Sequence, residues 1–523
     1  MSEPKLAGDQ IQGDSLAGFR KDHVSLLFLS FDETRIADVK RWLADLVPLL
    51  ARLSDVAHFN AAFKAQKNRL GDDPPMTALW RNIGFTASGL FKLAPRDQVK
   101  RFETAFLLGA AKRAAGLGDP TRGPGSPAEW LVGGPDNAPD AMLNLAADRE
   151  ADLKAERKRV LDSIAATGGA ISVVHEDTGN ACIAPRKGHE HFGFKDGVSQ
   201  PGIRGLIGSA DAPLTRRELA DDDPLADRFA APGLPLLFPG EFVVGYDRQS
   251  PTVPTDSQAE SLYRTEPEWA DNGSYLVYRR LRQDVRTFRK FVEHGVRQFR
   301  KRGIDVEPER FGAMCVGRWK SGVPIARAPL ADDPDIAADD KLHASQSFFF
   351  DSDTHPVRWK DGRAPDTFNP ARADGDGLAC PLAGHVRKVN PRDEGTDIGG
   401  AARTLRRRIL RRGVTYGPAY KPREKKGIDR GLLFLCYQRS IAEQFEFVWR
   451  VWSNKSGTPR AGAGIDPIIG QIGDRPPQER TAHFAIENAA AVTVSVPERF
   501  IISTGGAYLF VPSIDAIAGT LAR

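Results

Sequence analysis

HVSLLFLSF (His23–Phe31) is short, apolar and rich in β-branched and aromatic residues, and it predicts a buried strand. Asp32 follows as a candidate helix cap, and the apolar residues after it recur at helical spacing. The same layout returns at SYLVYRRL (Ser274–Leu281), where apolar residues from 285 to 299 again trace one helix face. The two strand–helix units begin about 250 residues apart. The pattern predicts an α+β protein of two lobes with a similar plan.

The stretch between the two units predicts where the lobes divide. Residues 140–148 and 168–177 read as further strands of the first lobe, on either side of a charged helix. A long Gly-, Pro- and Asp-rich stretch follows, which is typical of a connector. The expected organisation is an N-terminal lobe over residues 1–205, a connector over 206–240 and a C-terminal lobe over 241–523.

Composition excludes several classes of protein. The chain has 523 residues and 41% hydrophobic residues, ordinary for a globular protein, and its net charge of +5 is small for a nucleic-acid-binding protein. Its four cysteines lie far apart with no CxxC, which argues against zinc ribbons and thioredoxin-like pairs and suits a reducing compartment. No secretory signal and no long apolar run is recognisable, so we expect a cytoplasmic protein without a membrane span. Walker, GxSxG and HExxH motifs are also absent.

The segment GHEHFGFKDGVSQPGI (residues 188–203) is the first candidate for chemistry. Gly193 and Gly197 flank Asp196, and glycines at such positions permit tight turns and close approach of the backbone to a ligand. An aspartate held there is a candidate for proton transfer. The alternative is an ordinary Asp-Gly turn.

CPLAGHVRKVNPRD (residues 380–393) places His385 among small and apolar residues. No other metal-binding side chain lies at ligand spacing, so His385 is either structural or the single protein ligand of haem iron, whose porphyrin fills four other positions. In the second case Arg387, Lys388 and Arg392 are candidates to face the propionates.

Six arginines fall between Arg403 and Arg412. Such a run is usually a solvated surface or a contact with a polyanion, and the sharper alternative is that one arginine turns inward beside a bound oxidant. Nearby, GLLFLCY (residues 431–437) predicts a buried strand followed by an amphipathic helix. Leu432 and Phe434 share one face of that strand, and are either core or the lining of an apolar pocket.

Taken in order along the chain, several segments resemble the dye-decolorizing peroxidases, a family of haem peroxidases. The resemblance runs from about residue 11 to about residue 471 and is closest to the longer, non-exported bacterial members. The segments are IQGDSLAGF, GFKDG, GRWKSGVP (Gly317–Pro324), CPLAGHVRKVNPR, RRILRRGVTYG, GLLFLCYQ with QFEF, and GIDPIIGQ (Gly464–Gln471).

The resemblance implies a dimeric α+β-barrel type of fold, with two ferredoxin-like lobes of antiparallel sheets and flanking helices, and haem b in the second lobe. It implies that Asp196 and Arg411 are catalytic, with Arg412 and Arg408 as rivals to Arg411, and that His385 is the axial iron ligand. Asp466 would orient His385, with Asp474 as the alternative, whereas His189 and His191 receive no role. The implied haem contacts are Arg392, Gly193, Phe194, Lys195, Leu432, Phe434 and Asp466.

The implied activity is reduction of hydrogen peroxide through an oxo-ferryl intermediate, followed by one-electron oxidation of organic donors such as phenols and dyes. The implied partners are therefore peroxide and small aromatic reductants, with neither nucleic acid nor membrane, and a homo-oligomer is compatible with the pattern. Bulky dyes would react at the haem edge or through surface aromatics, for which Trp449, Trp452, Trp359 and Tyr416 are candidates. The rival functions are a haem carrier or iron-releasing protein that uses the same His385, and a polyanion-binding module built on the arginine run.

Overall fold

The computed structural model describes most of the chain. The described residues are 4–70, 75–181, 187–206, 229–231, 234–250, 259–260, 264–338, 350–351, 373–425, 427–497 and 499–523. Most of the expected connector over 206–240, and also Trp359 and Cys182, lie outside them. Among the described residues, no helix combines the length and the apolar character needed to cross a bilayer.

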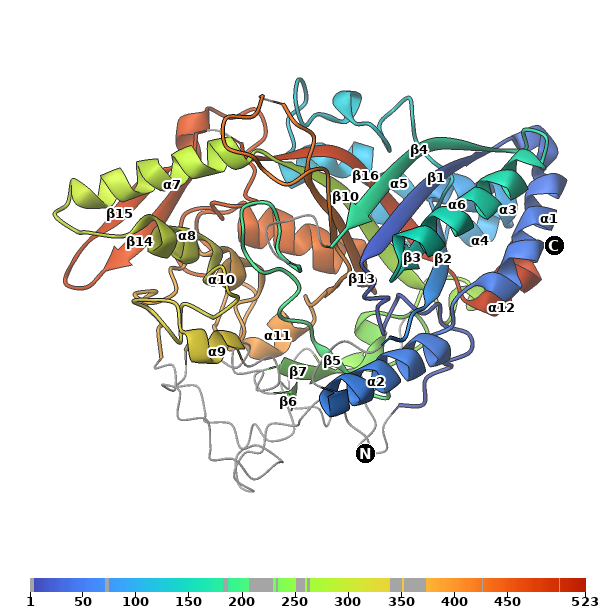
Figure 1. Cartoon of the computed structure of the whole chain (residues 1–523), viewed down its shortest axis with the longest axis horizontal. Helices are drawn as coiled ribbons and strands as arrows, with labels where there is room; N and C mark the ends of the chain where they lie inside the picture. The colour runs from blue at the N-terminus through green and yellow to red at the C-terminus, as the bar shows by residue number, and fades with distance from the viewer. Residues whose placement is uncertain are drawn as a thin grey trace.

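A nine-stranded antiparallel sheet organises the molecule (Figure 1). Its strand order is β11-β13-β10-β16-β2-β3-β1-β4, and β12 also pairs with β13. The strands are β1 (His23–Phe31), β2 (Leu79–Phe85), β3 (Ala141–Ala147), β4 (Ile171–Asn180), β10 (Ser274–Gln283), β11 (Leu410–Arg411), β12 (Val414–Tyr416), β13 (Gly431–Gln438) and β16 (Ile501–Val511). The expected antiparallel α+β class is confirmed.

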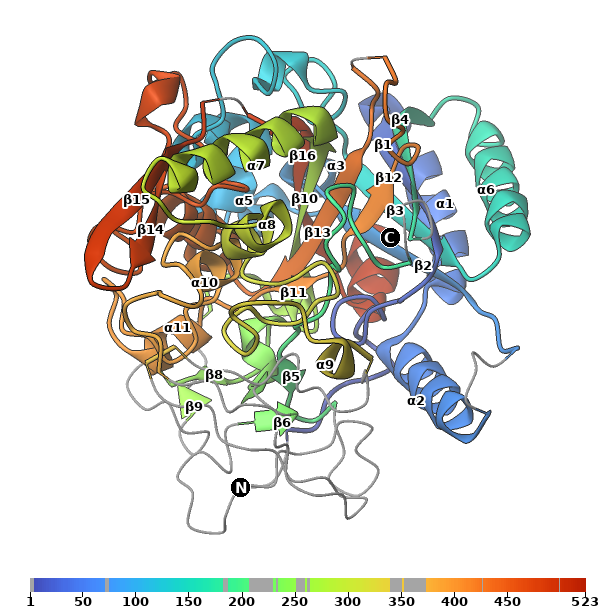
Figure 2. The ribbon, with the colours of Figure 1, turned by 60° about the vertical axis from the view of Figure 1, so that its left-hand side comes forward.

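The two halves of the chain meet within this sheet. Strands β1 to β4 come from the N-terminal half and the others from the C-terminal half, and Phe510 of β16 pairs with Phe85 of β2 at the junction. In Figure 1 most of the first half lies on the right and most of the second half on the left, although the C-terminus lies on the right. In Figure 2, β10, β13 and β16 lie side by side with α7 (Val285–Arg300) crossing in front. The division at residues 205 and 240 stays a prediction.

Helices cover both halves. Helix α6 packs on β1, β3 and β4, α5 packs on β16, and α7 packs on α8 and on the separate hairpin of β14 and β15. The longer elements are α1 (Ile36–Leu46), α2 (Leu53–Leu70), α3 (Ala87–Leu93), α5 (Thr104–Arg113), α6 (Glu150–Ala165), α7 (Val285–Arg300), α8 (Pro308–Val316), β14 (Thr481–Ile486) and β15 (Ala489–Ser495). The shorter ones are α4 (Arg96–Val99), α9 (Pro334–Ala338), α10 (His385–Val389), α11 (Ala401–Leu405), α12 (Ile514–Ala516), β5 (Gly202–Ile203), β6 (Phe229–Ala231), β7 (Leu234–Leu237), β8 (Arg248–Gln249) and β9 (Ala259–Glu260).

The sheet buries both of its faces, which explains the nearly continuous apolar runs of its strands. On β1, Leu27 and Leu29 belong to one hydrophobic cluster, whereas Leu26 and Phe28 belong to the other. Because successive side chains of a strand point to opposite faces, one apolar run serves two cores. The expected helix after β13 is present, but it winds as two π-helical turns, η9 (Ile441–Phe445) and η10 (Val448–Ser453).

Candidate active site

One cavity gathers most of the side chains that the sequence singles out. It encloses about 1630 Å³ of empty space, counting the part open to solvent. Its lining includes Phe194, Lys195, Asp196, His385, Arg392, Arg411, Leu432 and Phe434. Of the remaining expected haem contacts, Gly193 is not part of the lining, and Asp466 lies behind His385.

His385 is the first residue of α10, and a buried carboxylate sets its orientation. Its Nδ1 lies 2.7 Å from Oδ2 of Asp466, a side chain with no exposed surface. The other carboxylate oxygen of Asp466 accepts hydrogen bonds from the main-chain N–H groups of Ile468 and Ile469. Asp466 is thereby fixed, and Nε2 of His385 is the nitrogen left for a metal. The alternative, Asp474, is bonded to Thr121 at the surface instead.

Asp196 and Arg411 face each other in the same cavity. Nη1 of Arg411 donates to Oδ1 of Asp196 at 3.0 Å, and Nη2 donates to the carbonyl of Ser199 at 2.9 Å. The two side chains are 34% and 31% exposed, so a small molecule in the cavity can reach both.

Gln200 fixes the main chain of Arg411 relative to the Asp196 loop. Its side-chain amide donates to the carbonyl of Arg411 at 2.9 Å and accepts from the N–H of Arg411 at 3.1 Å, as a neighbouring strand would. The rival Arg412 points away and donates to the carbonyls of Asp14 and Leu16. The rival Arg408 lines the cavity but donates to Asn390.

Buried arginines give the cavity a cationic wall. The pKa of Arg318, Arg392 and Arg408 is lowered to about 9 each, chiefly by burial and in addition by repulsion from other guanidiniums that line the cavity. Like charges collected beside a cavity are costly unless an anion joins them. The arrangement therefore fits an anionic ligand.

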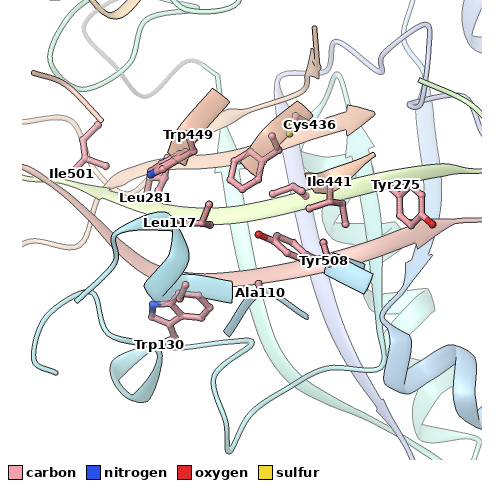
Figure 3. Close-up of a cluster of buried hydrophobic side chains, with 14 of the residues drawn as sticks. Ala110, Leu117, Trp130, Tyr275, Leu281, Cys436, Ile441, Trp449, Ile501 and Tyr508 are labelled. Carbon is pink, nitrogen blue, oxygen red and sulfur yellow. The ribbon is translucent and has the colours of Figure 1, made fainter. Parts of the chain in front are cut away.

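The remaining lining is largely apolar. Leu432 and Phe434 are half-buried and alternate along β13 with the fully buried Leu433 and Leu435, so the cavity lies against one face of this strand. Figure 3 shows Trp449, Leu281 and Ile501, three further lining residues, at one side of a buried cluster.

Several expectations are wrong in detail. Arg387 turns away from the cavity and pairs with Glu394, and Nζ of Lys388 donates to the carbonyl of Lys455. Arg387 and Lys388 thus have structural contacts, because the short helix α10 presents them to a different side from His385. The side chains proposed as surface aromatics are also buried, since they pack in or beside the core. They are Trp449, Trp452 and Tyr416, at 4%, 1% and 4% exposure.

The structure adds residues that the pattern did not single out. Arg318 lies in the GRWKSGVP segment and Glu190 in the GHEHFGFKDG segment, and both line the cavity. Their segments were recognisable, but nothing in the residue types told which side chains would turn inward. His189 and His191 do not line it, and their rings bond to main-chain carbonyls.

The donor set suits haem. Among the described residues, no group of three or more His, Cys, Asp or Glu side chains is arranged to hold a metal ion. A single histidine backed by a carboxylate, beside apolar walls and a cluster of arginines, instead suits a macrocycle that brings its own nitrogens and carries propionates.

Comparison with known proteins identifies the family. The chain is 30% identical to a dye-decolorizing peroxidase of Mycena epipterygia over 98% of this chain and 87% of that protein. The chain belongs to the dye-decolorizing peroxidase family. A family model described as "DyP dimeric alpha+beta barrel domain" matches residues 10–182, and one described as "Dyp-type peroxidase, C-terminal" matches residues 327–461.

Further relatives agree. The chain is 28% identical to a multifunctional dye peroxidase of Amycolatopsis, over 97% of this chain and 94% of that protein. A solved structure of an ancestral D-type dye-decolorizing peroxidase is 30% identical in sequence to this chain and superimposes with a TM-score of 0.74. The match covers 99% of this chain and 100% of the chain in that structure. The expected fold is thereby confirmed, as is the expected activity. The protein is an oxidoreductase that reduces peroxide and oxidises organic donors, rather than a haem carrier, and it depends on haem as its family does.

Proposed function

We propose that this dye-decolorizing peroxidase binds haem b through His385 and reduces hydrogen peroxide beside Asp196 and Arg411. The observation that carries the proposal is that one cavity contains both the Asp466-backed His385 and the Asp196–Arg411 pair. Bound haem would supply an iron that takes two oxidising equivalents from peroxide and passes them on one electron at a time.

Three sets of side chains would hold the cofactor. His385 binds the iron through Nε2, and Asp466 keeps Nδ1 as the protonated nitrogen, which makes the ligand more electron-rich. Arg392, with Arg318 and Arg408, pairs with the propionates, which would relieve the repulsion among these guanidiniums. Phe194, Leu432 and Phe434 would supply apolar contacts to the macrocycle. Gly193 and Lys195, on either side of Phe194, would bring the Asp196 loop against it.

Asp196 would move the proton in the peroxide reaction. Its Oδ1 accepts hydrogen bonds from Arg411 and from the N–H of Gly197. Among the described residues no bond to Oδ2 is present, and this oxygen is the one left to take a proton from peroxide and return it to the departing oxygen. The guanidinium of Arg411 would stabilise the negative charge that develops as the O–O bond breaks.

We further propose that small phenols and dyes are the donors and that the protein is cytoplasmic. The half-buried Leu432 and Phe434 narrow the cavity, which favours small donors over bulky ones. The cytoplasmic assignment is supported by Cys315, Cys380 and Cys436, which are buried free thiols. A homo-oligomer is compatible with the fold.

A haem titration tests the proposal. Purified protein is mixed with ferric haem, and the absorption spectrum is compared for wild type, His385→Ala and the control His483→Ala, which changes a histidine on the β14–β15 hairpin. We expect a ferric Soret band in wild type and in the control, and a weakened or shifted band in His385→Ala. Peroxide with a small phenol should then turn over in wild type. An unchanged spectrum in His385→Ala would overturn the assignment of the ligand.

A further inference from the structure

Glu190 lies inside the loop that carries Asp196, and its side chain bonds that loop to itself. Its Oε2 accepts from the N–H of Phe192 and its Oε1 from the N–H of Phe194, both at 2.8 Å. Oε2 also accepts from Nε2 of Gln283, at the end of β10, at 2.5 Å. One half-buried carboxylate at the edge of the cavity therefore receives three N–H donors.

These bonds are connected to Asp196 through the main chain. Two main-chain hydrogen bonds close the turn. The N–H of Glu190 donates to the carbonyl of Phe194, and the N–H of Gly193 donates to the carbonyl of Glu190. Gly193 has φ of 100°, which a residue with a side chain rarely adopts. The N–H of Asp196 then donates to the carbonyl of Gly188, so that the two arms of the loop are tied together just before the catalytic side chain.

The loop is also attached to the C-terminal half of the molecule at this point. Gln283 belongs to β10, and the rings of Phe192 and Phe194 pack on Phe288 of α7, with centroids 4.3 and 6.3 Å apart. The carboxylate of Glu190 thus joins the turn of the loop to the sheet that carries the rest of the site.

We propose that Glu190 is a positioning residue, which sets Asp196 in the cavity by accepting the loop's own amides and Gln283. The inference rests on the proposed role of Asp196. This role requires that both carboxylate oxygens of Glu190 accept hydrogen bonds, because the three groups that contact them are all N–H donors. A glutamine of the same shape has one acceptor end, and its NH₂ end would face a donor.

The ionisation of Glu190 agrees with this requirement for acceptors. Burial raises the pKa of Glu190 to about 7, the three hydrogen bonds hold it down, and the nearby charge of Asp196 raises it slightly. Asp196 is the charged group that faces it, while Gln283 and the two loop amides are neutral. The carboxylate, and with it the full set of acceptors, is therefore present above about pH 7.

Hydrogen exchange of the haem-free protein at pH 8 tests the inference without using catalysis. The variant is Glu190→Gln, and the matched control is Glu309→Gln, which changes an exposed glutamate paired with Lys320 nearby. We expect one of the two amides, that of Phe192 or of Phe194, whichever faces the NH₂ end of the glutamine, to lose protection by about tenfold in Glu190→Gln, as for one lost hydrogen bond, and both amides to keep their protection in the control. Unchanged protection of both amides would overturn the proposal.

Two further measurements keep the test decisive. If Glu190→Gln does not fold, Gln283→Leu leaves Glu190 in place and removes the two bonds that Gln283 makes to the loop, one to Oε2 of Glu190 and one from the N–H of His191. It should still raise exchange at Phe192. In the haem-loaded protein, Glu190→Gln should lower kcat/KM for peroxide while leaving the haem titration and the donor's kcat/KM unchanged. Asp196→Asn is measured in parallel. If it is as fast as wild type, the proposed function fails, whereas lost amide protection would still support the role of Glu190 in the loop.

Discussion

The bond between His385 and Asp466 shows how one pair of residues prepares a ligand. Asp466 has no exposed surface, and two main-chain N–H groups hold the carboxylate oxygen that does not contact His385. The ring of His385 is therefore oriented before any metal arrives, and its Nε2 is directed to the cavity side.

Replacing Asp466 by Asn tests this at the residue scale. The amide can still contact Nδ1 but carries no charge, so the histidine becomes a poorer electron donor. We expect haem to remain bound, the ferric/ferrous potential to rise, and peroxidase turnover to fall by about 10–100-fold. A spectroelectrochemical titration measures the potential, and an unchanged potential would contradict the role given to Asp466.

Glu190 predicts a pH dependence of stability. Its pKa is raised in the folded protein from 4.5 to about 7, so the folded state binds the proton more tightly than the unfolded state. Stability from this group is full below about pH 4.5 and is lost as pH rises through about 7. Urea unfolding of the haem-free protein should give a lower free energy of unfolding at pH 8 than at pH 5 in wild type, and a smaller difference between the two pH values in Glu190→Gln. Equal losses in the two proteins would argue against the raised pKa.

At the scale of elements, β13 separates the core from the cavity. Leu433 and Leu435 fill the core behind the strand, while Leu432 and Phe434 meet the cavity in front of it. The ring of Phe434 packs against Phe445 of η9, with centroids 6.1 Å apart, so the cavity wall is supported by the π-helical segment.

Shortening Phe434 should therefore change which donors are accepted. Phe434→Ala removes cavity wall without touching His385, Asp196 or Arg411. We expect kcat/KM for a bulky dye to rise by about tenfold relative to a small phenol, the size of effect that pocket volume commonly produces. Leu433→Ala, on the core side of the same strand, should lower stability without this change in preference. Steady-state kinetics with both donors checks it.

At the scale of the whole molecule, the site draws on both halves of the chain. The Asp196 loop follows β4 of the N-terminal half, whereas His385, Arg411 and β13 belong to the C-terminal half. The continuous sheet brings these parts together, and α7 holds the loop through Phe288.

A ligand in this cavity should therefore stabilise the entire fold. A ligand bound only by the folded state adds about 2.7 kcal/mol at a concentration 100 times its Kd. We expect haem to raise the Tm of wild type and to raise that of His385→Ala less. Differential scanning calorimetry measures both, and equal shifts would mean that haem binds without His385.

Much of this organisation could be predicted from sequence, because strand periodicity is a local property. The strands at residues 23–31 and from 274 have the expected positions, and the ordered motifs point to the residues that line the cavity. Side-chain direction was harder to predict. Arg387 and Arg392 are five residues apart, yet only Arg392 faces the cavity.

Burial depends on tertiary packing, which sequence proximity does not report. Trp449 and Trp452 lie within the predicted amphipathic helix and were candidates for contact with a donor, but both are buried in the folded protein. Glu190 was missed for a related reason. In the sequence it belongs to a glycine-rich turn, and only the folded loop shows that three N–H groups converge on its carboxylate.

The rate at which the haem-loaded protein reacts with peroxide measures the roles of Asp196 and Arg411 directly. Stopped-flow absorption compares wild type with Asp196→Asn, Arg411→Leu and the control Arg403→Leu, an exposed arginine from the same run. We expect a loss of about 10²–10³-fold in the second-order rate constant for each of the first two variants, and wild-type behaviour in the control. If both variants react within a few-fold of wild type, Asp196 and Arg411 do not carry the peroxide chemistry.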